Sequence, residues 1–113
     1  MILEDITMED FKRGLEATKT LILPLGTVEE HGTHLPLSTD TMVVYEIARK
    51  AAERIMVFVA PPIHYGVCTS TSQHPGTISI TFDTLRAILR DILISSYDKG
   101  LRNFILISGH AGG

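Results

Sequence analysis

Carboxylate and imidazole side chains are concentrated in residues 26–41, which read GTVEEHGTHLPLSTDT. Glu29, His31 and Asp40 lie in this segment, and His110 follows near the far end of the sequence. Oxygen and nitrogen donors without thiolates are typical of catalytic Zn²⁺, Mn²⁺ or Fe²⁺ sites. An aspartate has two oxygens and can bridge two metals, and two metals together activate water and polarise a carbonyl group. These residue types would therefore suit metal-dependent hydrolysis.

A plainer interpretation of the same residues stays open. On spacing alone, the sequence EEHGTH is more often a solvated loop than a metal site. Asp40 taken alone is typical of a helix cap, and a single His110 after a strand is a weaker signal still. Cys68 is expected to be a buried or loop thiol rather than a nucleophile. The two interpretations differ in whether the fold brings the donors together.

Apolar and amphipathic segments alternate along the chain. Helices are predicted over residues 7–17, from about residue 39 to 54, and over 83–100, the first of them capped by Thr7. Strands are predicted at residues 20–26, 55–62, 77–82 and 103–109, with Pro24 marking a strand end or an irregular exit. This order is typical of an α/β fold, in which helices cover a parallel sheet.

The predicted helices have definite apolar faces. In the second helix, which Thr39 or Thr41 can cap, Val43, Ile47 and Ala51 are expected on one face. The third helix should bury an apolar side made of Leu85, Ile88, Leu89 and Ile92.

The predicted topology would gather the donors at one edge of the sheet. Glu29 and His31 come just after the first strand, His110 comes just after the last, and Asp40 lies at a helix start. Open α/β sheets carry their sites at the carboxyl ends of the strands. If the strands are parallel, these side chains converge.

Composition narrows the classes of partner. The 113 residues carry a net charge of −3 without a basic stripe, so nucleic acid is not an expected partner. No apolar run is long enough for a membrane span, and the acidic N-terminus does not resemble a signal peptide. The single cysteine fits a reducing, cytoplasmic setting. One domain is expected over residues 1–113, and we expect it to be truncated because the last strand lacks a following helix.

Three segments resemble motifs of the creatininase family, also called creatinine amidohydrolases. LPLGTVEEHGTHLPLSTDT is similar to the family signature LP-hydrophobic-G-S/T-x-E-x-H-G-x-H-L-P-L-x-x-D. HPGTISI resembles the family segment FPGTIS, and ISGHAGG resembles its NGHGGN segment. The segments occur in the family's order, and the resemblance covers residues 21–113. It implies a three-layer α/β/α fold with a mainly parallel sheet, incomplete here at its C-terminus.

The resemblance also implies site residues. Two divalent metals, Zn or Mn with Fe as a further option, would be bound by Glu29, His31, Asp40 and His110, with Asp40 bridging. Glu30 falls on a position that is not a ligand. The substrate pocket would be bordered by His34, His74, Gly76 and Thr77.

The chain also departs from the family pattern. Gly112 stands where creatininase itself has a glutamate ligand, so that glutamate and the proton-transfer histidine would come from beyond Gly113. The residues CTSTSQH replace the family's S-x-E-H-x-x-F, with Cys68 at the serine position. This loop borders the substrate in the family, which argues against creatinine as the substrate.

The resulting prediction is a metal-dependent amidohydrolase that cleaves an amide or formamide C–N bond in a small, possibly cyclic, substrate. The resemblance implies a homo-oligomer, often a hexamer. A catalytically incomplete fragment that keeps the fold and part of the metal site is the first alternative. A nucleotide-binding module, based only on GHAGG after a strand, is the second. Metal content separates the module from the others, and residues beyond Gly113 separate the enzyme from the fragment.

Overall fold

A parallel three-stranded sheet forms the centre of the molecule. The computed structural model describes residues 1–111. Strands β1 (Thr20–Leu25), β2 (Phe58–Val59) and β3 (Asn103–Ser108) lie in the order β2-β1-β3. β1 pairs with β3 along its whole length, from Thr20 opposite Asn103 to Leu25 opposite Ser108. β2 pairs with β1 only at Leu21 and Ile22.

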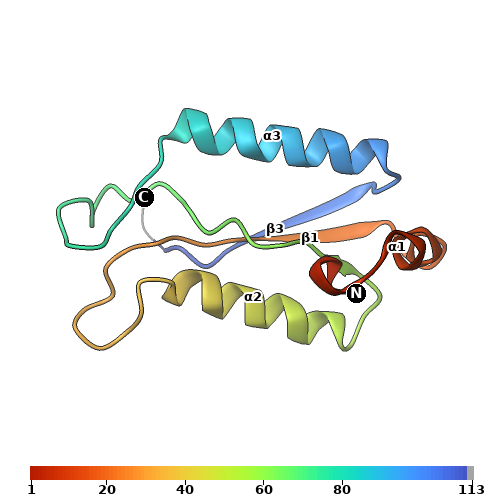
Figure 1. The fold of residues 1–113 in the computed structure, drawn as a ribbon, viewed down its shortest axis with the longest axis horizontal. Coiled ribbons are helices and arrows are strands. Elements are labelled where there is room, and N and C mark those ends of the chain that lie inside the picture. The colour runs from red at the N-terminus through yellow and green to blue at the C-terminus, as the bar shows by residue number, and fades with distance from the viewer. Residues whose placement is uncertain (112–113) are drawn as a thin grey trace.

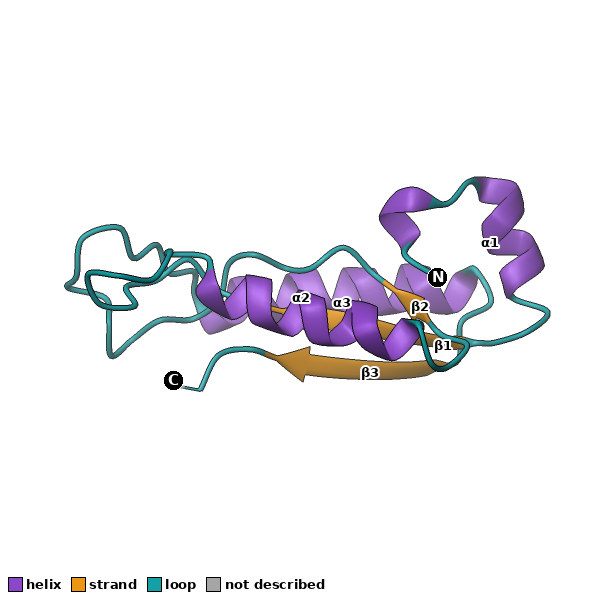
Figure 2. Ribbon diagram, turned by 90° about the horizontal axis from the view of Figure 1, so that it is seen from below, coloured by secondary structure: helices purple, strands orange, loops and turns teal. Residues whose placement is uncertain are grey.

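Helices cover both faces of this sheet. Helix α2 (Thr39–Ala52) lies on one face and α3 (Phe82–Asp98) on the other, as Figures 1 and 2 show. Helix α1 (Met8–Gly14) and a short 3-10 turn (Leu3–Asp5) lie at the amino ends of the strands. The arrangement is the predicted three-layer α/β/α fold with a parallel sheet. Within residues 1–111, each helix is too short or too polar to span a bilayer.

Strand β1 is buried because it supplies both sides of the core. Its alternate residues point to opposite faces of the sheet. Leu21 and Leu23 pack with Phe58 against α1 and α3, whereas Ile22 packs with Ala48 of α2. A strand covered on both faces favours a continuous apolar run over alternation, and the sequence TLILPL fits that pattern.

Pro24 lies one residue before the end of β1, close to the strand end that the sequence predicts there. Its carbonyl accepts a hydrogen bond of 2.9 Å from the Ile63 N–H, on the side where β2 has already ended. The N–H that proline lacks would point to that same side. The ladder therefore loses no bond there, and the strand continues.

The helix caps were predicted correctly in α1 and wrongly in α2. Thr7 caps α1 in a reciprocal capping box with Asp10. The residue that precedes α2 is Ser38, whose side chain makes no capping bond. The two expected caps have other partners: the Thr39 hydroxyl donates to the Pro36 carbonyl, and the buried Thr41 hydroxyl faces the Thr27 carbonyl.

The buried face of α2 also differs from the prediction. Val44 and Ala48 are fully buried, whereas Val43 and Ile47 are 51% and 53% exposed. The first turn of the helix is held at the sheet edge through Asp40, and residues four apart share one face of a helix. Positions 40, 44 and 48 therefore point inward. Of the predicted face, only Ala51 packs against the core.

Three smaller predictions need correction. Residues 77–82 form no strand, because among the described residues their only strand-type pairing is a single bridge between Val28 and Ile78. The predicted strand over residues 55–62 shortens to Phe58–Val59. In α3, Leu85, Leu89 and Ile92 pack on the core as expected, but Ile88 lies at the exposed margin of that face.

Candidate metal centre

Two glycines bring the start of α2 against the ends of β1 and β3. A Cβ atom at Gly26 would lie 1.8 Å from the Thr41 Oγ1, and one at Gly109 would lie 2.3 Å from the Asp40 carbonyl oxygen. Real Cβ atoms do not approach other atoms so closely, so only glycine permits this packing. The close approach places Asp40 beside the residues that follow both strands.

The four predicted donors meet at this edge. His31 Nε2 lies 2.9 Å from Asp40 Oδ1, and His110 Nδ1 lies 3.3 Å from Asp40 Oδ2. His110 Nδ1 is also 2.9 Å from Glu29 Oε1. The two oxygens of Asp40 thus face two different imidazoles. Glu29 and Asp40 are 5% and 9% exposed, so the cluster is largely shielded from solvent.

Hydroxyl groups hold both carboxylates in place. Thr27 Oγ1 donates a hydrogen bond of 2.7 Å to Asp40 Oδ2. Thr71 Oγ1 donates a hydrogen bond of 2.6 Å to Glu29 Oε2 and leaves Oε1 directed at His110. These contacts orient the carboxylates before any ligand arrives, as outer partners do at metal sites.

Backbone carbonyls fix the tautomers of both histidines. His31 Nδ1 lies 3.0 Å from the Glu29 carbonyl oxygen, and His110 Nε2 lies 3.1 Å from the Val67 carbonyl oxygen. A carbonyl only accepts, so each of these nitrogens carries the hydrogen. In a neutral ring the other nitrogen then presents its lone pair to a carboxylate. Lone pairs that face carboxylate oxygens need a cation between them, either a proton or a metal ion.

The pKa values of two of these groups respond to the same contacts. The hydrogen bond to the Glu29 carbonyl, aided by the Asp40 carboxylate, raises the pKa of His31 against the opposing effect of burial. Burial alone would raise the pKa of Asp40, but hydrogen bonds from Thr27 and neighbouring groups lower it below its usual value. Both directions favour an ionised carboxylate beside a positive charge.

Cys68 lies at the site, whereas the sequence predicts only a buried or loop thiol. It is buried, as expected, but its sulfur and donor atoms of Glu29 and His110 all lie within 4.8 Å of one another. Burial, followed by the nearby Glu29 and Asp40 carboxylates, raises the pKa of the thiol to about 11. One signal could have revealed it: Cys68 belongs to the loop that follows β2, at the same edge as the other donors.

Two of the residues predicted to border the substrate contact Glu30, which is next to Glu29 in the sequence. Thr77 Oγ1 accepts a hydrogen bond of 2.9 Å from the Glu30 N–H, and His74 Nε2 lies 3.9 Å from Glu30 Oε2. Gly76 packs against Leu37 with a positive φ of 86°, and His34 is exposed. Their role stays a prediction. The predicted departure at Gly112 lies outside the described residues.

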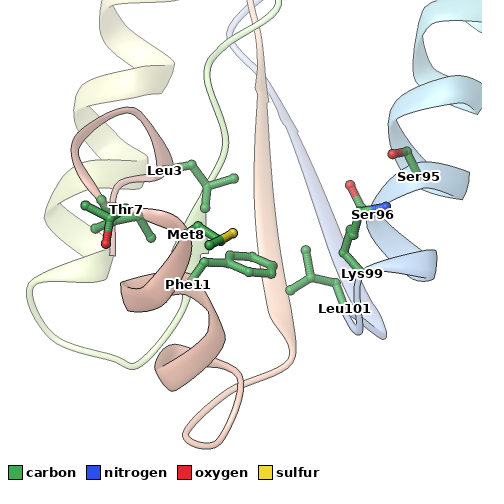
Figure 3. A pocket seen from close by; sticks show the side chains of 9 residues that line it. Leu3, Thr7, Met8, Phe11, Ser95, Ser96, Lys99 and Leu101 are labelled. Atoms are coloured by element: carbon green, nitrogen blue, oxygen red, sulfur yellow. The ribbon is translucent and has the colours of Figure 1, made fainter.

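Two cavities lie at opposite ends of the strands. A cavity of about 120 Å³ at the carboxyl ends is lined by His110 and Thr27 together with the apolar residues Leu25, Tyr65, Phe82 and Leu85. A larger hollow of about 340 Å³ lies between the N-terminal segment and the end of α3, where Figure 3 shows Leu3, Phe11, Lys99 and Leu101. Among the residues that the structure describes, no acidic or imidazole group lines this hollow, whereas His110 lines the smaller cavity.

The fold and these side chains define an α/β protein with a carboxylate–imidazole centre at the carboxyl ends of its strands. The sequence model of the creatininase family, described as creatinine amidohydrolase, matches residues 4–113. The chain therefore belongs to the creatininase family, as its sequence motifs predicted.

Relatives within the family have different names and substrates. The chain is 29% identical to a creatinine amidohydrolase of Pseudomonas putida, over 94% of this chain and 43% of that protein. It is 34% identical to a mycofactocin precursor peptide peptidase of Mycobacterium ulcerans, over 82% of this chain and 40% of the peptidase. The chain thus spans less than half the length of these curated relatives.

Solved structures agree with the family assignment. A manganese form of creatininase superposes with a TM-score of 0.92 at 28% identity, over 96% of this chain and 45% of the solved chain. A Zn–Zn form of a creatininase variant superposes with the same score and identity. The three-layer fold of this chain is accordingly that of the creatininase structures.

Proposed function

We propose that this chain carries the metal-binding part of a hydrolase that cleaves an amide-type C–N bond. The observation that carries the proposal is the convergence of Glu29, His31, Asp40 and His110 with both imidazole tautomers fixed. Two carboxylates and two neutral imidazoles suit a divalent cation with nitrogen and oxygen ligands. Creatininase structures with manganese and with zinc make these two metals the first candidates.

The donors divide into two groups that would hold two ions. His31 faces one oxygen of Asp40, and His110 faces the other oxygen of Asp40 together with Glu29. Asp40 is therefore the bridging ligand of the proposal. Bound divalent ions supply Lewis acidity toward a carbonyl group and favour ionisation of water. Thr27 and Thr71 keep the carboxylates oriented, and burial of the cluster keeps bulk water out.

The substrate class follows from the relatives and from the cavity. A creatinine amidohydrolase and a peptidase, by their names, both act on amide-type C–N bonds. The cavity beside His110 is small and mostly apolar, which suits a compact, possibly cyclic, group next to the scissile bond. The proposal therefore covers small amides and formamides and leaves peptides as an alternative substrate. It also includes a homo-oligomer, on the basis of family resemblance.

The two other interpretations make different predictions. A catalytically incomplete fragment would bind metal without turnover, because its remaining ligand and proton-transfer groups would lie outside this sequence. A nucleotide-binding module would use the loop after β3 to hold a phosphate. The buried carboxylates of Glu29 and Asp40 beside His110 would repel that phosphate, so the cluster favours a cation.

Metal content of two matched variants tests the proposal. The purified chain is equilibrated with Zn²⁺ or Mn²⁺, desalted and subjected to elemental analysis. Asp40→Asn should lose most of the bound metal, because an amide cannot bridge two cations as a carboxylate does. Glu30→Gln should retain it, because Glu30 contacts the Gly32 N–H and lies outside the cluster. Equal loss in the two variants would reject the ligand assignment.

Turnover separates the enzyme from the fragment. The metal-loaded chain is assayed with creatinine, a formamide and a short peptide, and the assay is repeated on a longer protein in which the chain is joined to the C-terminal part of a family relative. Metal binding with turnover only in the longer protein would support the incomplete-fragment interpretation for these 113 residues.

A further inference from the structure

The group around His110 contains a sulfur atom that the other half of the centre lacks. Cys68 Sγ, Glu29 and His110 offer donor atoms within 4.8 Å of one another, whereas Glu29, His31 and Asp40 form a second such group with oxygen and nitrogen only. Cys68 is 1% exposed. Its thiol donates a long hydrogen bond of 3.8 Å to the Gly66 carbonyl oxygen, and the Glu29 carboxylate is also close enough to interact with it. The sulfur is thus buried at the donor cluster.

The backbone around Cys68 also holds the neighbouring ligand. The Val67 carbonyl, one residue before Cys68, accepts the hydrogen bond that fixes the His110 tautomer. The Cys68 N–H donates a hydrogen bond of 2.8 Å to Ser79 Oγ, which anchors the loop. A single stretch of backbone therefore orients the imidazole and positions the thiol. Displacement of this loop would move both donors together.

We propose that Cys68 is a ligand of the metal ion held by Glu29 and His110, and that it makes this position selective for zinc-like ions over manganese. The inference rests on the proposed function, since it assumes a metal at this cluster. Thiolate is a soft ligand that Zn²⁺ and Co²⁺ accept readily, whereas Mn²⁺ prefers oxygen. On binding, the S–H bond breaks, the sulfur keeps the electron pair and bonds to the metal, and the proton passes to solvent.

The two halves of the centre then differ in metal preference. The ion between His31 and Asp40 has only nitrogen and oxygen donors from the described residues, which suit either metal. The ion beside Cys68 has a mixed sulfur, nitrogen and oxygen set. A mixed-metal solution should therefore fill the Cys68 position with zinc first.

Cobalt is a suitable probe, because it substitutes for zinc and reports its ligands by colour. The 113-residue chain is titrated with CoCl₂, and both the visible d–d bands and the near-ultraviolet thiolate-to-cobalt charge-transfer band are recorded. The wild-type chain should develop both. Cys68→Ser, which has a hydroxyl of similar size, should keep the d–d bands and lose the charge-transfer band. Cys68→Ala should do the same, which covers the case in which one variant folds poorly.

Competition between metals gives a second readout. Cys68→Ser should lower the affinity for Zn²⁺ by about tenfold or more, since even changes at the outer partners of metal ligands cost about 10–100-fold, and leave Mn²⁺ affinity nearly unchanged. Cobalt binding in the wild-type chain without a charge-transfer band would overturn the role of Cys68 and leave the proposed function intact. Failure of Co²⁺, Zn²⁺ and Mn²⁺ to bind at all would overturn both.

Discussion

The position of Asp40 depends on two glycines that allow the start of α2 to pack against the ends of two strands. The Asp40 backbone packs directly against Gly109 after β3, and Thr41 packs against Gly26 after β1. Both glycines follow apolar strands in the sequence. Glycine is required at these positions only because α2 packs directly against them, and the local sequence does not show where α2 packs. Glu29, His31, Asp40 and His110 converge as the sequence predicted, and their role as metal ligands stays a prediction; the proximity of Cys68 to them was not predicted. Cys68 lies close to Glu29 and His110 because of the position of the loop after β2. The spacing of residues along the sequence does not reveal that position.

Gly109→Ala should disrupt the centre without touching a donor. The new methyl group would lie 2.3 Å from the Asp40 carbonyl, so α2 must move away from the sheet edge. Overpacking of this kind costs about 1–3 kcal/mol of stability. We expect a lower free energy of unfolding in urea together with reduced retention of Zn²⁺. Unchanged stability and unchanged metal content would contradict the packing described here.

Within the elements, sequence periodicity predicted the three helices but not every buried face. In α2, apolar residues occupy positions 43, 44, 47 and 48, so two overlapping faces satisfy a helical period. The contact at Asp40 selects between them, and that contact joins distant parts of the chain. In contrast, β1 was predictable because a short, continuous apolar run in a small domain is typical of a buried strand.

Two neighbouring valines test the assignment of the α2 face. Val44 is 1% exposed and Val43 is 51% exposed. Val44→Ala should lower the free energy of unfolding by about 2 kcal/mol, from lost burial and the cavity left behind. Val43→Ala should change it by less than about 0.5 kcal/mol in the isolated chain. Urea denaturation of both variants measures these free energies of unfolding. A larger loss of stability in Val43→Ala than in Val44→Ala would show that the helix is rotated.

The capping box of α1 should make stability depend on pH. Hydrogen bonds from Thr7 lower the pKa of Asp10 below its usual value, with Arg13 contributing. A carboxylate with a lowered folded-state pKa stabilises the fold above its unfolded pKa of about 3.9 and loses that contribution as the pH falls. Wild-type chain should therefore exceed Asp10→Asn in stability at neutral pH, with the difference shrinking below about pH 4. A difference that is constant with pH would contradict the role of the ionised group.

At the scale of the whole molecule, β3 is the exposed margin of the sheet. It pairs with β1 on one side, and among the described residues no strand pairs with its other side. The sequence predicts cover on both faces for the apolar run NFILIS, yet Ile105 and Leu106 are 44% and 42% exposed. Residues that would cover the faces of this strand would belong to other parts of the chain or to a partner, and the local sequence pattern does not identify them. That residues 1–113 form one truncated domain, and that the protein is a hexamer, stay predictions.

This margin should make the isolated 113-residue chain associate. Unpaired strand edges and exposed apolar side chains favour pairing with other chains. Light scattering should show a mass that rises with concentration, and Leu106→Lys should reduce it by placing a charge on the exposed strand. Met8→Lys is the control, since Met8 is 79% exposed in α1, away from β3. Equal effects of the two variants would point to general solubility instead of this edge.

The location of bound metal tests the central claim most directly. Crystals of the chain grown with excess Zn²⁺ or Mn²⁺ would be measured at the absorption edge of each metal. We expect one anomalous peak between His31 Nε2 and Asp40 Oδ1, and a second beside Glu29 Oε1 and His110 Nδ1, with Asp40 contacting both. Peaks confined to exposed histidines such as His34 and His64, or no peak at saturating metal, would contradict the account.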